Sequence, residues 1–354
     1  MAKKVLHNKV DRKVLRQQLE SSAEPRTTIS FYKYHQLADP QAFRDELYER
    51  LEQWRVFGRV YVAHEGVNAQ VSVPTELLDE FKAELYSIDW MNGCRLNIAV
   101  EDDGKSFYKL KIKVRPKIVA DGLNDDTFDV TRRGKHLTAE EFNYITSQDG
   151  AIVVDMRNHY ESEVGHFAGA VLPDSDNFRD MLPMVEDMLE EHRDKHIVMY
   201  CTGGIRCEKA SAYFKHKGFP KVYQLDGGII EYARQVKEQG LENRFVGKNF
   251  VFDDRLGERI SDEVIAHCHQ CGKPCDTHTN CKNVACNLLF IQCEECAEEH
   301  EGTCSTECQD FLHLPEEQQE ELRRGRQNDH RFFRKGRFGQ SPFLKETHDQ
   351  EAAH

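Results

Sequence analysis

The stretch Tyr200-Cys201-Thr202-Gly203-Gly204-Ile205-Arg206-Cys207 follows a short apolar run and begins a helical pattern that ends at Gly218. Its two glycines let the backbone curl so that several amide N–H groups point inward, and the helix that begins here adds positive potential. Arg206 adds a full charge. The stretch therefore predicts a strand–loop–helix unit that holds Cys201 as a thiolate nucleophile.

Other interpretations of these two cysteines are possible. Cysteine phosphatases use a similar cradle with five residues between Cys and Arg, but four separate Cys201 from Arg206, a smaller loop better suited to a persulfide sulfur. Buried cysteines at strand ends are common, but the Gly-Gly pair beside an arginine argues against simple packing. Cys207 is either a second thiol for a disulfide with Cys201 or, more simply, a packed side chain.

The segments around this loop indicate a parallel sheet. Ala151 to Val154, Ile197 to Tyr200 and Val222 to Leu225 are short apolar runs typical of buried parallel strands. Thr138 and Glu141 form a capping box that predicts the start of a helix. Alternating strands and helices favour an α/β domain.

The N-terminal third shows a different order of elements. Helical patterns begin after Asp39-Pro40 and at Thr75. The strand patterns are Thr28 to Tyr34, Gly58 to His64, Ala69 to Val73, Arg95 to Val100 and Ser106 to Arg115. The order βαββαβ predicts a ferredoxin-like α+β domain over residues 28–118.

Composition limits the class of protein. The chain has 354 residues, 39% of them hydrophobic and 31% charged, which fits several folded domains and excludes collagen-like or wholly disordered classes. No apolar run approaches the roughly 18 residues of a membrane helix, and the first residues lack a signal-peptide core, so we expect a cytoplasmic protein without membrane association. The net charge of −13 argues against general nucleic-acid affinity.

One predicted strand nevertheless carries a row of cations. They occupy alternate positions at Lys109, Lys111, Lys113, Arg115 and Lys117. Period two places them on one face at intervals of about 6.6 Å, close to the phosphate spacing of a nucleic-acid strand. This face could follow an RNA backbone, although lysines on an exposed strand also prevent aggregation.

The C-terminal tail is a second basic segment. Beyond Pro315 the composition becomes Glu/Gln-rich and then Arg/Phe-rich, so we expect disorder or folding on binding. Between Arg323 and Arg337, seven cations are interleaved with Phe332 and Phe333. Cations bind phosphates and aromatic rings stack on unpaired bases, but a generic adhesive tail would have the same composition.

Nine of the twelve cysteines lie between positions 268 and 308, which indicates metal binding rather than disulfides in an intracellular chain. The first predicted zinc site consists of two CxxC pairs, Cys268, Cys271, Cys293 and Cys296. The second predicted set is Cys275, Cys281, Cys304 and Cys308, with Cys286 spare. Iron–sulfur coordination is the main competitor. Structural zinc would substitute for the small core of this module.

Four motifs of the central segment occur in a known order and spacing. They are Asp155-Met156-Arg157, Gly165-His166-Phe167-Ala168-Gly169-Ala170, the loop Cys201 to Arg206, and Leu225-Asp226-Gly227-Gly228-Ile229. In these motifs the segment resembles the rhodanese family. The resemblance implies that Cys201 forms a persulfide, that Arg157 and Arg206 lie near the pocket, and that Asp155 is a structural or hydrogen-bonding partner. Rhodanese folds host many functions, so the resemblance implies chemistry rather than substrate.

The resulting prediction is a multidomain protein of mixed α/β and α+β class. The predicted parts are an extension (1–27), a ferredoxin-like domain (28–118), a linker (119–134), a rhodanese-like domain with a parallel sheet (135–240), a connector (241–260), a Cys-rich metal-binding module (261–312) and a basic, disordered tail (313–354).

Longer segments extend the resemblance to nearly the whole chain. They are residues 24–34 (EPRTTISFYKY), 64–70 (HEGVNAQ), 103–107 (DGKSF) and 200–208 (YCTGGIRCE). With them the chain resembles the rhodanese-domain tRNA uridine(34) hydroxylase family, in its longer bacterial form with a Cys-rich C-terminal region. The resemblance implies oxygen-dependent 5-hydroxylation of the wobble uridine, with tRNA as partner and molecular oxygen as co-substrate.

The sequence leaves the mechanism and the electron donor open. No Gly-rich dinucleotide fingerprint indicates a flavin or nicotinamide site. His159, Glu161 and His166 could form a two-His-one-carboxylate iron site, but their place in a rhodanese motif argues against it. Our hypothesis is that Cys201 adds to C6 of a splayed-out uridine and makes C5 nucleophilic. The alternatives are a persulfide sulfurtransferase and a non-catalytic RNA-binding adaptor.

Overall fold

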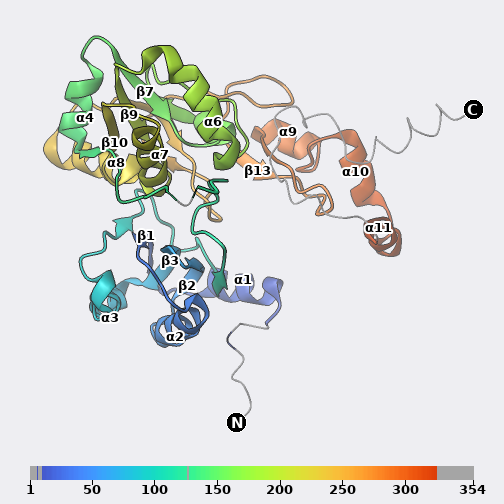
Figure 1. Cartoon of the computed structure of the whole chain (residues 1–354). Helices are drawn as coiled ribbons and strands as arrows, with labels where there is room; N and C mark the ends of the chain where they lie inside the picture. The colour runs from blue at the N-terminus through green and yellow to red at the C-terminus, as the bar shows by residue number, and fades with distance from the viewer. Residues whose placement is uncertain (1–5, 7–9, 126, 325–354) are drawn as a thin grey trace, which may run out of the picture.

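The computed structural model describes residue 6 and residues 10–125 and 127–324. Figure 1 shows an N-terminal lobe below a central lobe, with the C-terminal region to one side of the central lobe. The predicted chain order of domains is therefore visible as three regions in space.

The N-terminal lobe is built on a five-stranded sheet in the order β4-β1-β3-β2-β5. Its strands are β1 (Arg26–Tyr34), β2 (Phe57–Ala63), β3 (Gly66–Pro74), β4 (Asn97–Ile98) and β5 (Leu110–Val114). Its helices are α1 (Arg12–Ser21), α2 (Pro40–Gln53) and α3 (Leu78–Tyr86), with short 3-10 turns η1 (Thr75–Leu77) and η2 (Asp89–Met91). The first four strands have the ferredoxin-like order, which confirms the predicted domain, and β5 adds a strand parallel to β2.

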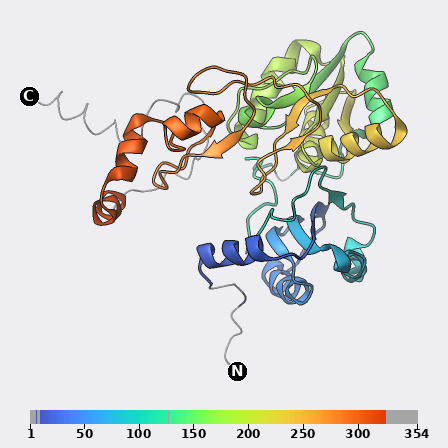
Figure 2. The same cartoon turned by 180° about the vertical axis from the view of Figure 1, so that it is seen from behind.

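The two faces of this sheet differ. Leu47 and Leu51 of α2 and Phe81 and Leu85 of α3 pack on Ile29 and its same-face neighbours to form the core of the lobe. The opposite face carries polar and aromatic side chains and turns toward the central lobe. Figure 2 shows α1 alongside this sheet, where Arg16 pairs with Asp254 of the C-terminal region.

The central lobe is a doubly covered parallel sheet in the order β6-β10-β9-β7. Its strands are β6 (Lys135–Leu137), β7 (Ala151–Asp155), β9 (His196–Tyr200) and β10 (Val222–Leu225). Its helices are α4 (Ala139–Thr146), α5 (His159–Ser162), α6 (Phe178–Leu189), α7 (Ile205–His216) and α8 (Gly228–Gln239), with η3 (Glu190–His192) after α6. Helices α6 and α7 cover one face, and α4 and α8 cover the other. The predicted capping box of Thr138 and Glu141 starts α4.

The C-terminal region begins inside the central lobe. Strand β11 (Phe245–Asn249) pairs with β8 (Gly165–Phe167) and with β12 (Glu258–Arg259), so the segment predicted as a connector contributes strands. The Cys-rich part contains β13 (His278–Asn280), β14 (Leu289–Ile291), α9 (Glu294–Glu299) and α10 (Thr306–His313). Helix α11 (Glu316–Arg323) follows, so the prediction of a disordered tail is wrong for this stretch. The basic segment from residue 325 onward lies outside the described residues.

Buried ion pairs join the two lobes. The Lys209 ammonium on α7 lies 2.9 Å from Glu65 in the turn after β2 and 2.5 Å from Asp121 in the linker, and the Lys209 side chain is only 1% exposed. Tyr32 of β1 donates a 3.0 Å hydrogen bond to Glu208, the residue before Lys209. Because a buried charge is costly without its partners, these contacts fix the N-terminal sheet opposite the loop that follows β9.

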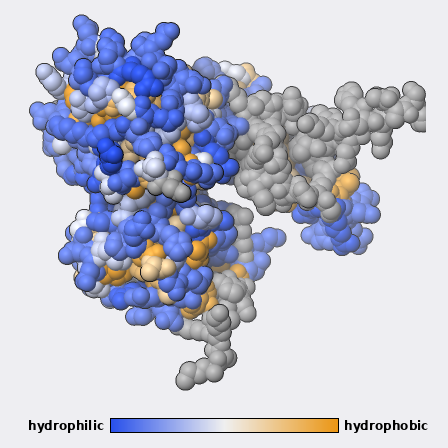
Figure 3. Space-filling view, viewed as in Figure 1, coloured by the Kyte–Doolittle hydropathy of each residue, from blue (hydrophilic) through white to orange (hydrophobic). Residues whose placement is uncertain are grey.

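The surface seen in Figure 3 is mostly hydrophilic, and its hydrophobic residues gather mainly on the N-terminal lobe. Within the described ranges, every helix is too short or too polar to cross a bilayer.

Candidate functional site

The predicted strand–loop–helix unit is present, with Cys201 between β9 and α7. Gly204 adopts a left-handed conformation with φ of 97°, and a Cβ there would lie 2.8 Å from the Tyr32 hydroxyl. The Gly204 amide donates a 3.2 Å hydrogen bond to the Cys201 sulfur. The glycine is therefore needed both for the turn of the loop and for its close approach to the opposing sheet.

Several groups favour the ionised form of Cys201. Burial alone would raise the pKa of this thiol, but the Cys207 thiol, the Arg206 charge and the amides of Cys207 and Gly204 outweigh burial and lower the pKa to about 6. The lowered pKa supports the thiolate that the sequence predicts at Cys201. Its side chain is more enclosed than that prediction implied, at 1% exposure, and it reaches solvent only through the cavity that it lines.

Arg206 is held by a carboxylate that the sequence analysis did not select as its partner. Glu161 of α5 forms a bidentate ion pair with Arg206, at 2.6 and 2.8 Å, and Glu161 is fully buried. Arg206 also lies 3.4 Å from the Thr202 hydroxyl, within the loop. The pair fixes the guanidinium beside Cys201, but Glu161 sits 45 residues earlier in the chain, and no local spacing reveals it.

Asp155 and Arg157 do not line the cavity. They form a buried hydrogen-bonded pair, which is the structural role that the resemblance implies for Asp155. Both are fully buried and pair with each other at 2.6 Å. Asp155 also accepts a hydrogen bond from the Tyr200 hydroxyl, and Arg157 donates to the Gly165 carbonyl. Tyr200 immediately precedes Cys201. The Asp155–Arg157 pair therefore supports the end of β9 from within the core and does not touch a ligand.

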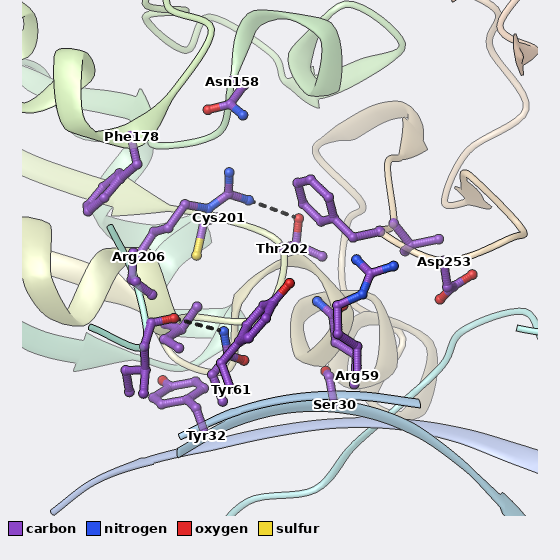
Figure 4. Close-up of a pocket in the computed structure, with 18 of the residues that line it drawn as sticks. Ser30, Tyr32, Arg59, Tyr61, Asn158, Phe178, Cys201, Thr202, Arg206 and Asp253 are labelled. Carbon is purple, nitrogen blue, oxygen red and sulfur yellow. Dashed lines mark hydrogen bonds between the residues drawn. The ribbon is translucent and has the colours of Figure 1, made fainter. Parts of the chain in front are cut away.

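A cavity of about 1080 Å³ separates the cysteine loop from the N-terminal sheet. Figure 4 shows the Cys201 sulfur directed into it from one side, with Tyr32 and Tyr61 rising from the sheet on the other. The loop residues Thr202, Gly203 and Ile205 also line it. The volume is at the upper end of the range for small-molecule sites, enough for a nucleotide.

The sheet side of the cavity consists of polar and aromatic residues that the sequence analysis missed. They are Ser30, Tyr32, Arg59, Tyr61, Asn68, Gln70 and Asn97. Asn97 donates a 3.4 Å hydrogen bond to the Gly203 carbonyl and so ties this wall to the loop. Polar side chains alternate with period two along β1, β2 and β3, and this pattern could have indicated a polar face of the sheet. The pattern alone does not show that this face lies opposite the cysteine loop.

The predicted row of cations is only partly continuous. Lys111 pairs in register with Arg59, and Lys113 with Tyr61, so these residues share the face that borders the cavity. Burial, reinforced by repulsion from Lys113, Lys109, Arg59 and Arg115, lowers the pKa of Lys111, as expected for clustered cations.

The C-terminal end of the row is less available. Arg115 lies over the Tyr61 ring at 5.6 Å, outside β5. Lys117 turns away to pair with Asp121 at 2.5 Å, so its inclusion in one open face is wrong. The regular alternation ends because β5 stops at Val114, two residues before Pro116.

Two groups of four cysteines converge in the C-terminal region. The first, Cys268, Cys271, Cys293 and Cys296, is the predicted set, and its sulfurs all lie within 4.8 Å of one another. Sulfurs 3.6 Å apart, as in Cys271 and Cys293, are too distant for a disulfide. They match the edge of about 3.8 Å of a tetrahedron with Zn–S bonds of about 2.3 Å.

The second group is Cys281, Cys286, Cys304 and Cys308, so the choice of Cys275 with Cys286 spare is wrong. The Cys286 and Cys304 sulfurs are 3.7 Å apart, and those of Cys304 and Cys308 are 3.8 Å apart. A turn through Asn283 brings Cys286 back toward Cys281, whereas Cys275 packs in a different cluster, with Cys268 and Cys296. Both groups fit four-thiolate zinc.

The iron site weighed from His159, Glu161 and His166 is not formed. Glu161 is committed to Arg206, His159 pairs with Asp176, and the His166 ring contacts the Ser162 carbonyl. Among the described residues, the two cysteine groups are the only sets of three or more potential ligands that converge within 4.8 Å.

Comparison with known proteins divides the chain into three matched domains. Residues 26–118 match the UPF0176 acylphosphatase-like domain, residues 138–235 the rhodanese-like domain, and residues 246–309 the rhodanese C-terminal domain. A Helicobacter pylori protein solved by NMR is 28% identical and covers 32% of this chain and 88% of its own, with a TM-score of 0.24. The fold and the cysteine loop together define a multidomain rhodanese-type protein.

Full-length relatives narrow this class. The tRNA uridine(34) hydroxylase of Pectobacterium atrosepticum is 58% identical over 334 residues, covering 94% of each chain. That of Photorhabdus laumondii is also 58% identical, covering 94% of this chain and 95% of its own. The chain belongs to the tRNA uridine(34) hydroxylase family.

Proposed function

We propose that this protein is an oxidoreductase that hydroxylates C5 of uridine 34 in tRNA, with molecular oxygen as co-substrate and Cys201 as nucleophile. The observation that carries the proposal is a cysteine sulfur of lowered pKa that faces a nucleotide-sized cavity whose opposite wall is aromatic and amide-rich. The names of the full-length relatives supply the substrate and the position of the modified base.

The wall opposite Cys201 suits a base taken out of its stack. Tyr32 and Tyr61 offer ring faces, and stacking of a base on an aromatic side chain contributes about 1–3 kcal/mol. Asn68, Gln70 and Asn97 offer amides for the polar edge of uracil. Burial, followed by the Glu208 charge, raises the pKa of Tyr32 well above its usual value, so this residue presents a neutral phenol.

The sulfur can activate C5 by adding next to it. A bond from the Cys201 thiolate to C6 moves the C5=C6 electron pair toward C5 and O4, and C5 becomes the nucleophile that takes oxygen. Loss of the C5 proton and expulsion of the thiolate then restore the double bond. Arg206 keeps the departing sulfur ionised, and Glu161 keeps Arg206 in place.

We assign the anticodon backbone to the cationic edge of the cavity. Arg59 lies on the cavity wall, and Lys111 and Lys113 continue the same face on the outer strand β5. A smaller cavity lined by Arg115 and Arg179 shares Tyr61 and Ile118 with the main one and extends the positive track. Phosphates flanking an inserted uridine would meet these cations.

The two cysteine groups are proposed as structural zinc sites. The first packs in one cluster with Tyr160 and Phe250, next to the α5 turn that supplies Glu161. Bound metal would therefore support the segment that holds Arg206, in addition to replacing a core in the Cys-rich region.

The test is mass spectrometry of tRNA nucleosides from a deletion strain complemented with wild-type or Cys201→Ser protein. Loss of 5-oxygenated uridine in the deletion, restored only by wild type, is expected. The same six-residue loop would also suit a persulfide sulfurtransferase. Loss of thiolated uridine instead, together with rapid thiocyanate formation from cyanide and thiosulfate, would favour that second function.

A further inference from the structure

A second cysteine stands directly behind the proposed nucleophile. Cys207 lies in the first turn of α7, is 0% exposed, and belongs to the same buried cluster as Cys201. Its thiol and its amide are near enough to the Cys201 sulfur to help lower the pKa of Cys201. The loop residues from Cys201 to Arg206, Gly204 excepted, line the cavity, whereas Cys207 does not. The two sulfurs are therefore neighbours with only one facing the ligand.

The pair is chemically asymmetric. Burial, followed by the hydrogen bond to the Cys201 sulfur, raises the pKa of Cys207 well above its usual value, whereas that of Cys201 is lowered to about 6. At neutral pH the pair is therefore one thiolate at the cavity and one protonated thiol behind it. Such an arrangement is suited to a nucleophile with a resolving partner.

The proposed hydroxylation has an unmet requirement. Inserting one atom of dioxygen into the C5–H bond and releasing the other as water consumes two electrons and two protons. We propose, resting on that function, that Cys201 and Cys207 are a dithiol–disulfide pair that supplies these electrons within the active site.

The atoms balance in two steps. First the expelled Cys201 thiolate attacks the outer oxygen of a C5 hydroperoxide, which carries the proton lost from C5. The O–O bond breaks, the outer oxygen stays on the Cys201 sulfur as a sulfenic acid, and the inner oxygen takes one proton from solvent to become the C5 hydroxyl group. Then the Cys207 sulfur attacks the Cys201 sulfur, the S–S bond forms, the S–O bond breaks, and the oxygen leaves as water with the Cys207 proton. Both sulfurs are oxidised, and dioxygen is reduced.

The cavity also defines how the pair is reset. An external thiol, small or on a redox protein, can reach the Cys201 sulfur through the cavity, whereas Cys207 is enclosed. Attack at Cys201 expels Cys207 as the leaving group and forms a mixed disulfide, which a second external thiol resolves. The proposed co-reactant is therefore a thiol reductant rather than a nicotinamide or flavin.

The decisive experiment is a single turnover with the full-length, zinc-loaded enzyme. The protein is reduced, freed of added thiol, and mixed in air with tRNA from the deletion strain; peptide mass spectrometry under non-reducing conditions then reads the cysteines. We expect at most one 5-hydroxyuridine per enzyme and one Cys201–Cys207 disulfide per product. Adding dithiothreitol should restore repeated turnover.

The variant Cys207→Ser separates redox chemistry from hydrogen bonding, because serine retains a donor toward Cys201 but cannot form the disulfide. We expect a single turnover that leaves the Cys201 sulfenic acid, trapped by dimedone, and repeated turnover reduced by more than about tenfold. Cys94→Ser is the matched control, since Cys94 is also a buried free thiol, 2% exposed, in the N-terminal lobe.

Each outcome of these experiments supports or overturns either the dithiol inference or the proposed function. Wild-type product formed with both thiols still reduced, more than one product per enzyme without added thiol, or wild-type turnover by Cys207→Ser would overturn the inference and leave the hydroxylation intact. Absence of 5-hydroxyuridine from wild type with every reductant would instead reject the proposed function. The wild-type measurement stands even if the variant fails to fold.

Discussion

The loop after β9 and the Cys-rich region use the same side chain in opposite surroundings. Cys201 is a single sulfur approached by backbone amides, a thiol and a guanidinium. In the Cys-rich region, four sulfurs face one another in each of two groups, at separations of 3.6–3.8 Å where they contact. Around Cys201 the protein itself supplies the groups that compensate the negative charge of the thiolate. In the Cys-rich region, a bound cation would have to compensate the negative charge of four thiolates.

This difference separates a reactive cysteine from structural cysteines. A thiolate stabilised by hydrogen bonds and one cation keeps its lone pairs available for carbon or sulfur. Four thiolates that share a metal are coordinated and shielded.

The largest effect should come from replacing the lone sulfur. Cys201→Ser should lower hydroxylation of tRNA by more than about a thousandfold, because serine is not ionised at neutral pH. Cys94→Ser should retain activity and serves as the control. The readout is 5-hydroxyuridine per tRNA in vitro, and a Cys201→Ser enzyme with substantial activity would remove the sulfur from the mechanism.

In the metal region, a pair of single substitutions should separate a ligand from a neighbour. We expect two zinc ions per chain by elemental analysis, one in Cys286→Ala and two in Cys275→Ala. Chelation should expose residues 261–312 to proteolysis while the two sheets remain folded. Iron with inorganic sulfide, or loss of zinc from the Cys275 variant alone, would contradict the assignment.

These regions also differ in how far the sequence predicts them. The loop, the strands around it and the first cysteine set follow from residues close together in the chain, where spacing fixes geometry. The choice between Cys275 and Cys286 depends on the turn at Asn283, which spacing does not determine. Two other features depend on packing between segments that are distant in the chain: the pairing of Glu161 with Arg206, and the cavity wall that contains Tyr32 and Tyr61. Periodicity therefore indicated a polar face of the sheet but not the loop that lies opposite it.

The charge of the lone sulfur should appear in its pH dependence. Iodoacetamide should alkylate Cys201 with a rate that rises with pH through a midpoint near 6, since the thiolate is the reactive form. The double variant Arg206→Met with Glu161→Gln removes the cation without leaving a buried carboxylate unpaired, and should raise the midpoint by about 1 unit or more. A wild-type midpoint near the ordinary value of about 8.5 would contradict the proposed cradle.

The smallest expected effect is on tRNA binding. We place the tRNA on the side of the molecule that carries Cys201. Replacing both Lys111 and Lys113 with Gln should weaken tRNA binding a few-fold at moderate salt and reduce the slope of log affinity against log salt by about 1–2, since each phosphate contact releases counterions. Lys195→Gln is the control: Lys195 is exposed and precedes β9, at the opposite end of the strand from Cys201. An unchanged slope in the double variant would assign these lysines to solubility. Only cations that contact phosphates alter the salt dependence of binding, and cations on an unbound surface strand do not.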